Sequence, residues 1–197
     1  MAPTAYPRPT GQWMTPAGAP RWWFDSGALA VDFAYTGAFA ESDESIHAEP
    51  DLAAWLTARF AEFDGSVSDR ELLDARNLRG AIARAVLAAS RGERPDSADV
   101  DLINLYAATP DIPPVLAGGS RQAGRRIARV GQTLSEMARQ AVELLSDEHR
   151  ERIRECSASD CHVVFYDESR SNNRRWCSMA RCGNRAKVRK HRSGVRG

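Results

Sequence analysis

Apolar residues recur every three or four positions along most of the chain, which is the spacing of one buried face of an α-helix. The pattern predicts helices that begin near residue 50 and that run from about 69 to 89, 97 to 108 and 125 to 145. The longest begins at a capping box, Ser68-x-x-Glu71, in which each side chain satisfies a backbone N–H of the first turn. The side chains expected in the core are Leu52, Trp55, Leu56, Phe60, Leu72, Leu73, Leu78, Ile82, Val86, Leu87, Val100, Ile103, Leu105, Tyr106, Ile127, Val130, Leu134, Met137, Ala141, Val142 and Leu145.

Other segments carry weaker patterns. Residues 27–36 alternate like a strand, but the surrounding helices favour a short helix there. Residues 109–124 contain three prolines and three glycines, which predicts a loop or small hairpin. Residues 1–20 contain five prolines, so we expect a flexible N-terminal arm over residues 1–25. Ser146 is a candidate N-cap for a further short helix.

The last quarter of the chain has a different pattern. Residues 161–166 favour a strand, residues 167–173 are rich in turn formers, and residues 174–177 predict a second strand before a helix that begins near Cys182. The predicted fold is mainly α, with an N-terminal helical domain followed by a small, treble-clef-like ββα finger. We expect the arm over 1–25, the helical domain over 26–150, the finger over 151–193 and a tail over 194–197.

All four cysteines lie in this last quarter, as Cys156-x4-Cys161 and Cys177-x4-Cys182. Two short-spaced pairs joined by a hairpin-sized segment are what a tetrahedral four-thiolate zinc site requires. Disulfides and an iron–sulfur cluster are the alternatives. Residues 1–26 hold no secretory signal, which predicts a reducing, cytoplasmic location and disfavours disulfides; iron–sulfur spacings are commonly tighter. We therefore expect one structural zinc, without His162 as a ligand.

The net charge of +1 conceals an uneven distribution. Residues 150–197 hold 13 Lys and Arg against 5 Asp and Glu, a net charge of +8, whereas residues 1–149 hold 14 against 21, a net charge of −7. A basic module on an acidic body predicts a polyanionic partner for the module alone. No apolar run approaches the ~18–20 residues that a membrane-spanning helix needs, so no membrane partner is expected.

Basic residues gather in and beside the expected C-terminal helix. At 100° per residue, Arg185, Arg189 and Arg192 share one helix face, which can meet phosphates or a guanine edge, although a charge run can also be a merely solvated face. The candidate nucleic-acid contacts are Arg174, Arg175, Arg185, Lys187, Arg189, Lys190 and Arg192. Structural roles are assigned to Trp176 in the finger's small core, to Gly183 at a tight backbone position, and to Asn184 bonding backbone or sulfur.

The segment WCSMARCGNRAKVR, residues 176–189, resembles the CGNR zinc-finger family, together with the upstream cysteine pair and the turn at 167–170. Members pair this finger with an N-terminal helical domain called ABATE and are described as stress-induced transcriptional regulators. Resemblance to ABATE rests on ALAVDF at 28–33, DLAAWL at 51–56, NLR at 77–79 and AVELL at 141–145. It implies a zinc-binding, regulatory protein of two parts. One departure is Tyr35-Thr36, where the family usually has Asn-Thr.

These observations favour a DNA-binding transcriptional regulator, in which the helical domain senses a ligand, forms a homodimer or contacts the transcription machinery. The alternative is an adaptor whose basic finger grips an acidic protein surface, for example on RNA polymerase. A hydrolase is disfavoured, because the chain has only four histidines and a closed four-thiolate site leaves no open coordination position. Loss of Cys177 or Cys182 is expected to unfold the finger and to leave the helical domain intact.

Overall fold

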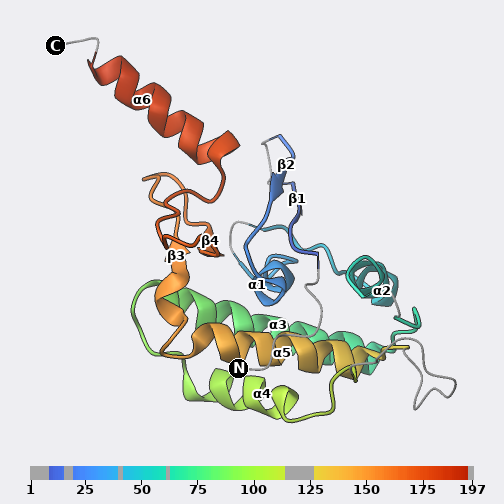
Figure 1. Ribbon diagram of the computed structural model, residues 1–197. Coiled ribbons are helices and arrows are strands. Elements are labelled where there is room, and N and C mark those ends of the chain that lie inside the picture. Colours follow the sequence, from blue (N-terminus) through green and yellow to red (C-terminus); the bar gives the residue numbers. More distant parts are fainter. Residues whose placement is uncertain (1–8, 16–19, 40–41, 61–62, 114–126, 195–197) are drawn as a thin grey trace, which may run out of the picture.

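The computed structural model describes residues 9–15, 20–39, 42–60, 63–113 and 127–194. Within these ranges a helical body carries a small finger at one side, and no helix there is long and apolar enough to cross a membrane (Figure 1). The elements are β1 (Gln12–Met14), β2 (Trp22–Phe24), α1 (Leu29–Ala34), α2 (Glu49–Thr57), α3 (Asp69–Ser90), α4 (Ser97–Ala107), α5 (Val130–Leu145), a 3₁₀ turn (Arg150–Arg152), β3 (Ile153–Glu155), β4 (Val164–Tyr166), a π-helical turn (Met179–Gly183) and α6 (Asn184–Gly194).

Helix α1 lies at the centre of the body, and every one of its residues is buried. Helices α3 and α5 pack against one side of it, α4 packs against both of them, and the β1–β2 hairpin lies over α1 on the other side (Figure 1). The short helix predicted within residues 27–36 is thus confirmed. It is fully apolar except for Asp32, because no part of it faces water.

The long helices follow the predicted spacing. The capping box of α3 forms, with the Ser68 hydroxyl accepting from the Glu71 N–H and the Glu71 carboxylate accepting from the Ser68 N–H. Five side chains expected in the core are instead between 37% and 63% exposed. A helix buries only the face that another element covers, and these side chains lie beside that face or outside the helices: Leu73, Val100, Leu105, Ile127 and Val142.

Helix α5 begins five residues later than predicted, at Val130. Ala128 pairs with Phe63 in an isolated parallel bridge, and Arg129 is extended, with its N–H donating to the Gln132 side chain. Ser146 also differs from its prediction, since its hydroxyl donates to the Glu143 carbonyl at the end of α5. The further short helix expected after Ser146 is only the 3₁₀ turn at Arg150–Arg152. Most of the loop expected over 109–124 lies outside the described residues.

The expected flexible arm differs from what the structure shows for residues 9–15 and 20–25. Strands β1 and β2 pair antiparallel there, with Met14 and Phe24 buried against the body. Gly11 lets the chain before β1 pass close to the Trp23 ring of β2. Its φ is +90°, and an added Cβ would lie 2.5 Å from that ring. Residues 1–8 and 16–19 lie outside the described residues.

The finger's hairpin also differs from its prediction. Strand β4 lies in the expected segment, but its partner is β3, which precedes the first cysteine, and not residues 174–177. Those residues form no ladder, since the Arg174 N–H donates to the Asp167 carboxylate and the Arg175 carbonyl accepts from the Ser157 N–H. The ββα order holds, with the first cysteine pair between the two strands.

The finger shares its core with the helical body. The free edge of β4 is bound by Tyr35, whose hydroxyl accepts from the Val164 N–H at 2.7 Å and donates to the Val164 carbonyl at 3.1 Å. The Tyr166 N–H donates to the Ser26 carbonyl at 2.7 Å. Gly27 allows this contact, because an added Cβ would lie 2.4 Å from the Tyr166 carbonyl oxygen. The two parts therefore meet through backbone hydrogen bonds and not only through side chains.

Asp32 gives the body a pH-dependent stability. Burial raises its pKa to about 6 from 3.8, although its carboxylate accepts from the N–H groups of Gly11 and Ser26. A pKa raised on folding contributes stability that is full below pH 3.8 and is lost as the pH rises through about 6. We expect Asp32→Asn to remove this loss. From pH 4 to pH 7 the parent's free energy of unfolding should fall by on the order of 2 kcal/mol relative to that of the variant, because only the parent has this carboxyl group.

Denaturant unfolding at several pH values measures this difference. Asp101→Asn is the matched control, because it removes an exposed carboxylate of α4. Parallel pH profiles for the parent and the Asp32 variant would contradict the assignment.

Candidate metal centre

Two short turns bring the four cysteines together. Cys156 directly follows β3, and Cys161 stands shortly before β4, so the first pair occupies the end of the β3–β4 hairpin. The Cys156 N–H donates to the Val163 carbonyl and so continues the ladder to the first sulfur. Cys177 precedes the π-helical turn and Cys182 lies within it, two residues before the start of α6 at Asn184. The predicted position of the last cysteine at the start of a helix is confirmed.

The sulfur atoms have the spacing of a tetrahedral zinc site. All four Sγ atoms lie within 4.8 Å of one another, with 3.8 Å between Cys161 and Cys177 and 3.5 Å between Cys177 and Cys182. Four sulfurs at about 2.3 Å from one ion stand about 3.8 Å apart, which these distances match. They are far longer than the ~2.05 Å of a disulfide. The four cysteines are free thiols and are all buried.

The four thiols are close enough to shift one another's pKa. The hydrogen bond between the Cys161 and Cys177 sulfurs lowers the pKa of Cys161 to about 5. The same hydrogen bond raises the pKa of Cys177, and burial raises it further. Burial likewise raises the pKa of Cys156. An ion bound by all four sulfurs would hold them all as thiolates, since metal-bound thiols are deprotonated. His162 lies outside the set, with its Nδ1 2.7 Å from the Glu155 carboxylate.

Arg185 and Arg189, two members of the predicted helix stripe, bind the first cysteine turn. Both donate to one carboxylate oxygen of Asp160, at 3.1 and 3.0 Å. Burial acts to raise the pKa of Asp160, but the two arginines together lower it. Arg185 also donates to the Cys182 sulfur at 3.1 Å. A hydrogen bond to a ligand sulfur orients the ligand and offsets its charge, so Arg185 supports the metal site.

Arg174 does not have the open position expected of a phosphate contact. Its guanidinium donates to the carbonyls of Asp25, Trp176 and Cys177, at 2.9, 3.1 and 2.6 Å, and lies 4.3 Å from the centre of the Phe165 ring. Burial lowers its pKa, and the nearby acidic groups act in the opposite direction. Arg174 thus joins the N-terminal segment to the second cysteine turn.

Three of the other basic candidates are more open than Arg174. Arg175, Lys187 and Arg192 are exposed, and Lys190 belongs to α6. Arg175 lies over the Trp176 ring at 5.2 Å.

The three residues assigned structural roles lie beside the cysteines. Trp176 is half-buried against the core. Gly183 is buried, and an added Cβ there would lie 2.7 Å from the Met179 sulfur and 3.3 Å from the Trp176 ring. Asn184 begins α6 and is exposed, and within the described residues its side chain makes none of the hydrogen bonds expected.

Three residues that position the site were not assigned a role from sequence. Tyr35 binds β4, Asp160 binds the two α6 arginines, and the buried Asp167 carboxylate accepts from the Ser169 and Arg174 N–H groups in the turn between the cysteine pairs. Asp167 could be suspected from its turn-rich surroundings. Tyr35 carried one signal, its departure from the usual Asn of the resembled family.

A helical body joined to a four-thiolate ββα finger defines a two-part, mainly helical protein with a structural zinc site. Residues 27–148 match the ABATE family model, described as "Putative stress-induced transcription regulator", and residues 152–193 match the model of the CGNR zinc finger. The first match covers more than half of the chain, so the protein belongs to the ABATE family, and it carries a CGNR zinc finger that binds one structural zinc. Comparison with curated proteins finds no match.

Removal of one ligand should abolish zinc binding. We expect Cys182→Ser to lower the zinc content, measured by elemental analysis of the purified protein, from one ion per chain to well below that value. Ser178→Ala is the matched control, since it alters the same turn without touching a sulfur ligand. A variant that retains stoichiometric zinc would show that Cys182 is not a ligand.

Arg185 and Arg189 provide a matched pair, because both bind Asp160 and only Arg185 contacts a sulfur. We expect Arg185→Ala to weaken zinc affinity by about 10-fold or more, the usual effect of losing a partner of a metal ligand. Arg189→Ala should leave it nearly unchanged. Competition with a chromogenic chelator measures both affinities, and equal values would place Arg185 outside the metal site.

Proposed function

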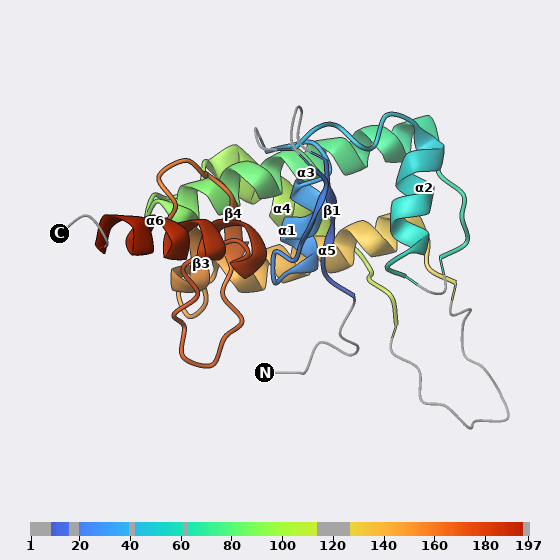
Figure 2. The same cartoon turned by 90° about the horizontal axis from the view of Figure 1, so that it is seen from above.

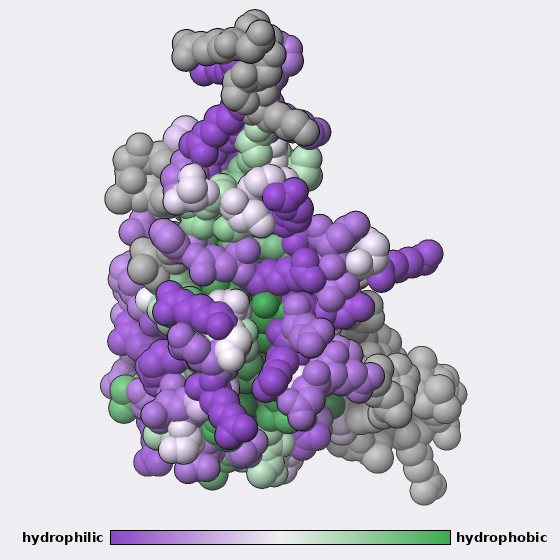
Figure 3. All heavy atoms as spheres, turned by 90° about the vertical axis from the view of Figure 1, so that its left-hand side faces the viewer, coloured by the Kyte–Doolittle hydropathy of each residue, from purple (hydrophilic) through white to green (hydrophobic). Residues whose placement is uncertain are grey.

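We propose that the protein is a transcription regulator that binds DNA through helix α6 and its finger. The observation that carries the proposal is the form and charge of α6. The helix holds five basic residues and no acidic one. It extends away from the body, with its C-terminal end farthest out, in both perpendicular views (Figures 1 and 2). In the space-filling view the finger rises as a narrow projection above the broad body (Figure 3).

The dimensions of α6 suit the major groove of DNA. Its 11 residues make a rod about 16 Å long. An α-helix with its side chains is about 10–12 Å wide, and the major groove is about 12 Å wide. The zinc and the Arg185–Asp160 bond fix the first turn of α6 to the finger, so its outer turns can be held rigidly against a groove.

The contact face differs from the stripe expected from helical spacing. Arg185 and Arg189 turn toward Asp160, and that carboxylate offsets part of their charge. Lys187 and His191 lie four residues apart on another face and are exposed. Arg192 shares the face of Arg185 and Arg189 but lies nearer the C-terminal end of the helix, and it is exposed too. We therefore assign the first contacts with phosphates to Lys187 and Arg192. Within the described residues neither forms an ion pair.

Loss of these charges should weaken DNA binding and its dependence on salt. For Lys187→Ala and Arg192→Ala we expect each variant to bind duplex DNA more weakly. Each should also reduce the slope of log affinity against log salt by about 0.9, the effect of one phosphate contact. Arg94→Ala removes an exposed charge from the body and is the control. Unchanged slopes for the α6 variants would place the DNA contacts elsewhere.

Selection of bound sequences from a random duplex pool by the zinc-loaded protein, at two salt concentrations, tests the proposal as a whole. Enrichment of one motif that persists at the higher salt is the expected result. A pool that remains random and is released by salt would contradict sequence-specific binding, and it would favour the adaptor that grips an acidic protein.

A further inference from the structure

The N-terminal hairpin exposes aromatic surface that the fold does not use. Trp13 and Trp23 are cross-strand partners, with ring centres 5.6 Å apart, and they are 53% and 50% exposed. Their strand neighbours Met14 and Phe24 are buried. The hairpin thus packs one face on the body and presents two tryptophans on the other. It also lies before residue 27, where the ABATE match begins.

The hairpin is attached to the finger and not only to the body. The Arg181 guanidinium of the π-helical turn lies 4.7 Å from the Trp22 ring centre, and Arg174 donates to the Asp25 carbonyl. Because Arg181 directly precedes Cys182 and Arg174 donates to the Cys177 carbonyl, the metal site fixes the hairpin and the finger relative to each other.

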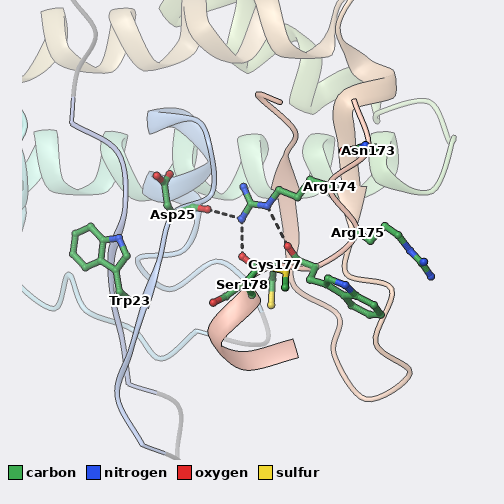
Figure 4. Close-up of a pocket in the computed structure, with 9 residues that line it drawn as sticks. Trp23, Asp25, Asn173, Arg174, Arg175, Cys177 and Ser178 are labelled. Carbon is green, nitrogen blue, oxygen red and sulfur yellow. Dashed lines mark hydrogen bonds between the residues drawn. The ribbon is translucent and has the colours of Figure 1, made fainter. Parts of the chain in front are cut away.

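A cleft of about 560 Å³ lies between the hairpin and the finger, within the ~300–1,000 Å³ of ligand sites. Trp23 forms one wall and the loop from Asn173 to Met179 forms the other, with Arg174 spanning the space between them (Figure 4). Trp176 lines the finger side. The cleft therefore has a tryptophan on each of its two sides.

The charges around this cleft favour an anionic occupant. Arg175 lies over Trp176, Arg181 over Trp22, and Arg21 over Trp13 at 4.4 Å. Within the described part of the chain no carboxylate forms an ion pair with Arg175 or Arg181. One carboxylate, that of Asp25, lines the cleft and accepts from the Gly27 N–H. Guanidinium planes beside indole rings form stacking surfaces that every nucleobase can use.

We propose that this cleft binds an unpaired nucleobase of a nucleic-acid strand, with the base against Trp23 and a neighbouring phosphate on Arg175. The inference rests on the proposed function, in which the finger binds nucleic acid. It adds a second contact, which recognises a single strand and not the duplex. A groove for an uncharged peptide would need the aromatic walls but not the surrounding arginines, and the charge therefore favours a nucleic-acid strand.

Binding of the zinc-loaded, full-length protein to a labelled oligothymidylate and to a duplex of equal length tests the inference by fluorescence anisotropy. Trp23→Ala should weaken oligothymidylate binding about 5- to 100-fold, the effect of one lost stacked base, and should leave duplex binding nearly unchanged. Trp23→Phe should retain most of the affinity. Arg175→Gln, an exposed position, should also weaken oligothymidylate binding while preserving the fold. Leu105→Ala, an exposed apolar residue of α4, is the control.

The possible results separate this inference from the proposed function. If the Trp23→Ala and Arg175→Gln variants bind oligothymidylate like the parent while duplex binding persists, the inference about the cleft is overturned and the proposed function stands. If thymidine monophosphate and the oligomer bind equally well and both depend on Trp23, the ligand of the cleft is a free nucleotide and not a strand. If a proline-rich peptide binds in a Trp23-dependent way and oligothymidylate does not bind, the ligand of the cleft is a peptide. Lys187→Ala should weaken duplex binding in each case if the proposed function holds.

Discussion

The Tyr35 hydroxyl holds strand β4 to the helical body, and the position of the finger depends on it. This hydroxyl satisfies both the N–H and the carbonyl of Val164, on the edge of β4 that faces away from β3. An unpaired strand edge buried against a helix would cost the free energy of its lost hydrogen bonds. Tyr35 directly follows the fully buried helix α1, so the centre of the body and the start of the metal site form one unit.

The zinc site completes the same connection from the other side. The β3–β4 hairpin places Cys156 and Cys161, and the second turn places Cys177 and Cys182 directly before α6. Residues 153 and 163–165 are buried together with the body's core, which a free-standing finger of this size would not show. The expectation that metal loss spares the helical domain therefore needs revision. The metal, the hairpin and the body should stabilise one another.

Much of the architecture was predictable because it depends on local patterns. The capping box at Ser68, the helical spacing and the paired cysteines are read from neighbours in sequence. The partner of β4 was not predictable, since segments as short as 153–155 and 174–177 carry too little pattern to decide, and tertiary contacts choose between them. Arg174 and Arg175 show the same limit: the residue type is the same, but Arg174 is enclosed by backbone carbonyls and Arg175 faces solvent.

The N-terminal hairpin could not be predicted either, because its prolines indicate a flexible arm while its burial depends on partners far along the chain. Asp32, on α1, accepts from the Gly11 N–H, and Arg59 donates to the Gly11 carbonyl at 3.3 Å. These contacts hold the strands that carry the exposed tryptophans. The proposed α6 contact and the proposed cleft are therefore held around one metal site, and the geometry of the cleft depends on the body.

Hydrogen–deuterium exchange of the full chain, before and after zinc removal by a chelator, tests most directly whether the finger and the body are one unit. Faster exchange on zinc removal is predicted in β3, β4 and the π-helical turn, and also in α1 and the β1–β2 hairpin. An increase confined to residues after 150, with α1 and the hairpin still protected, would show an independent finger and contradict the account.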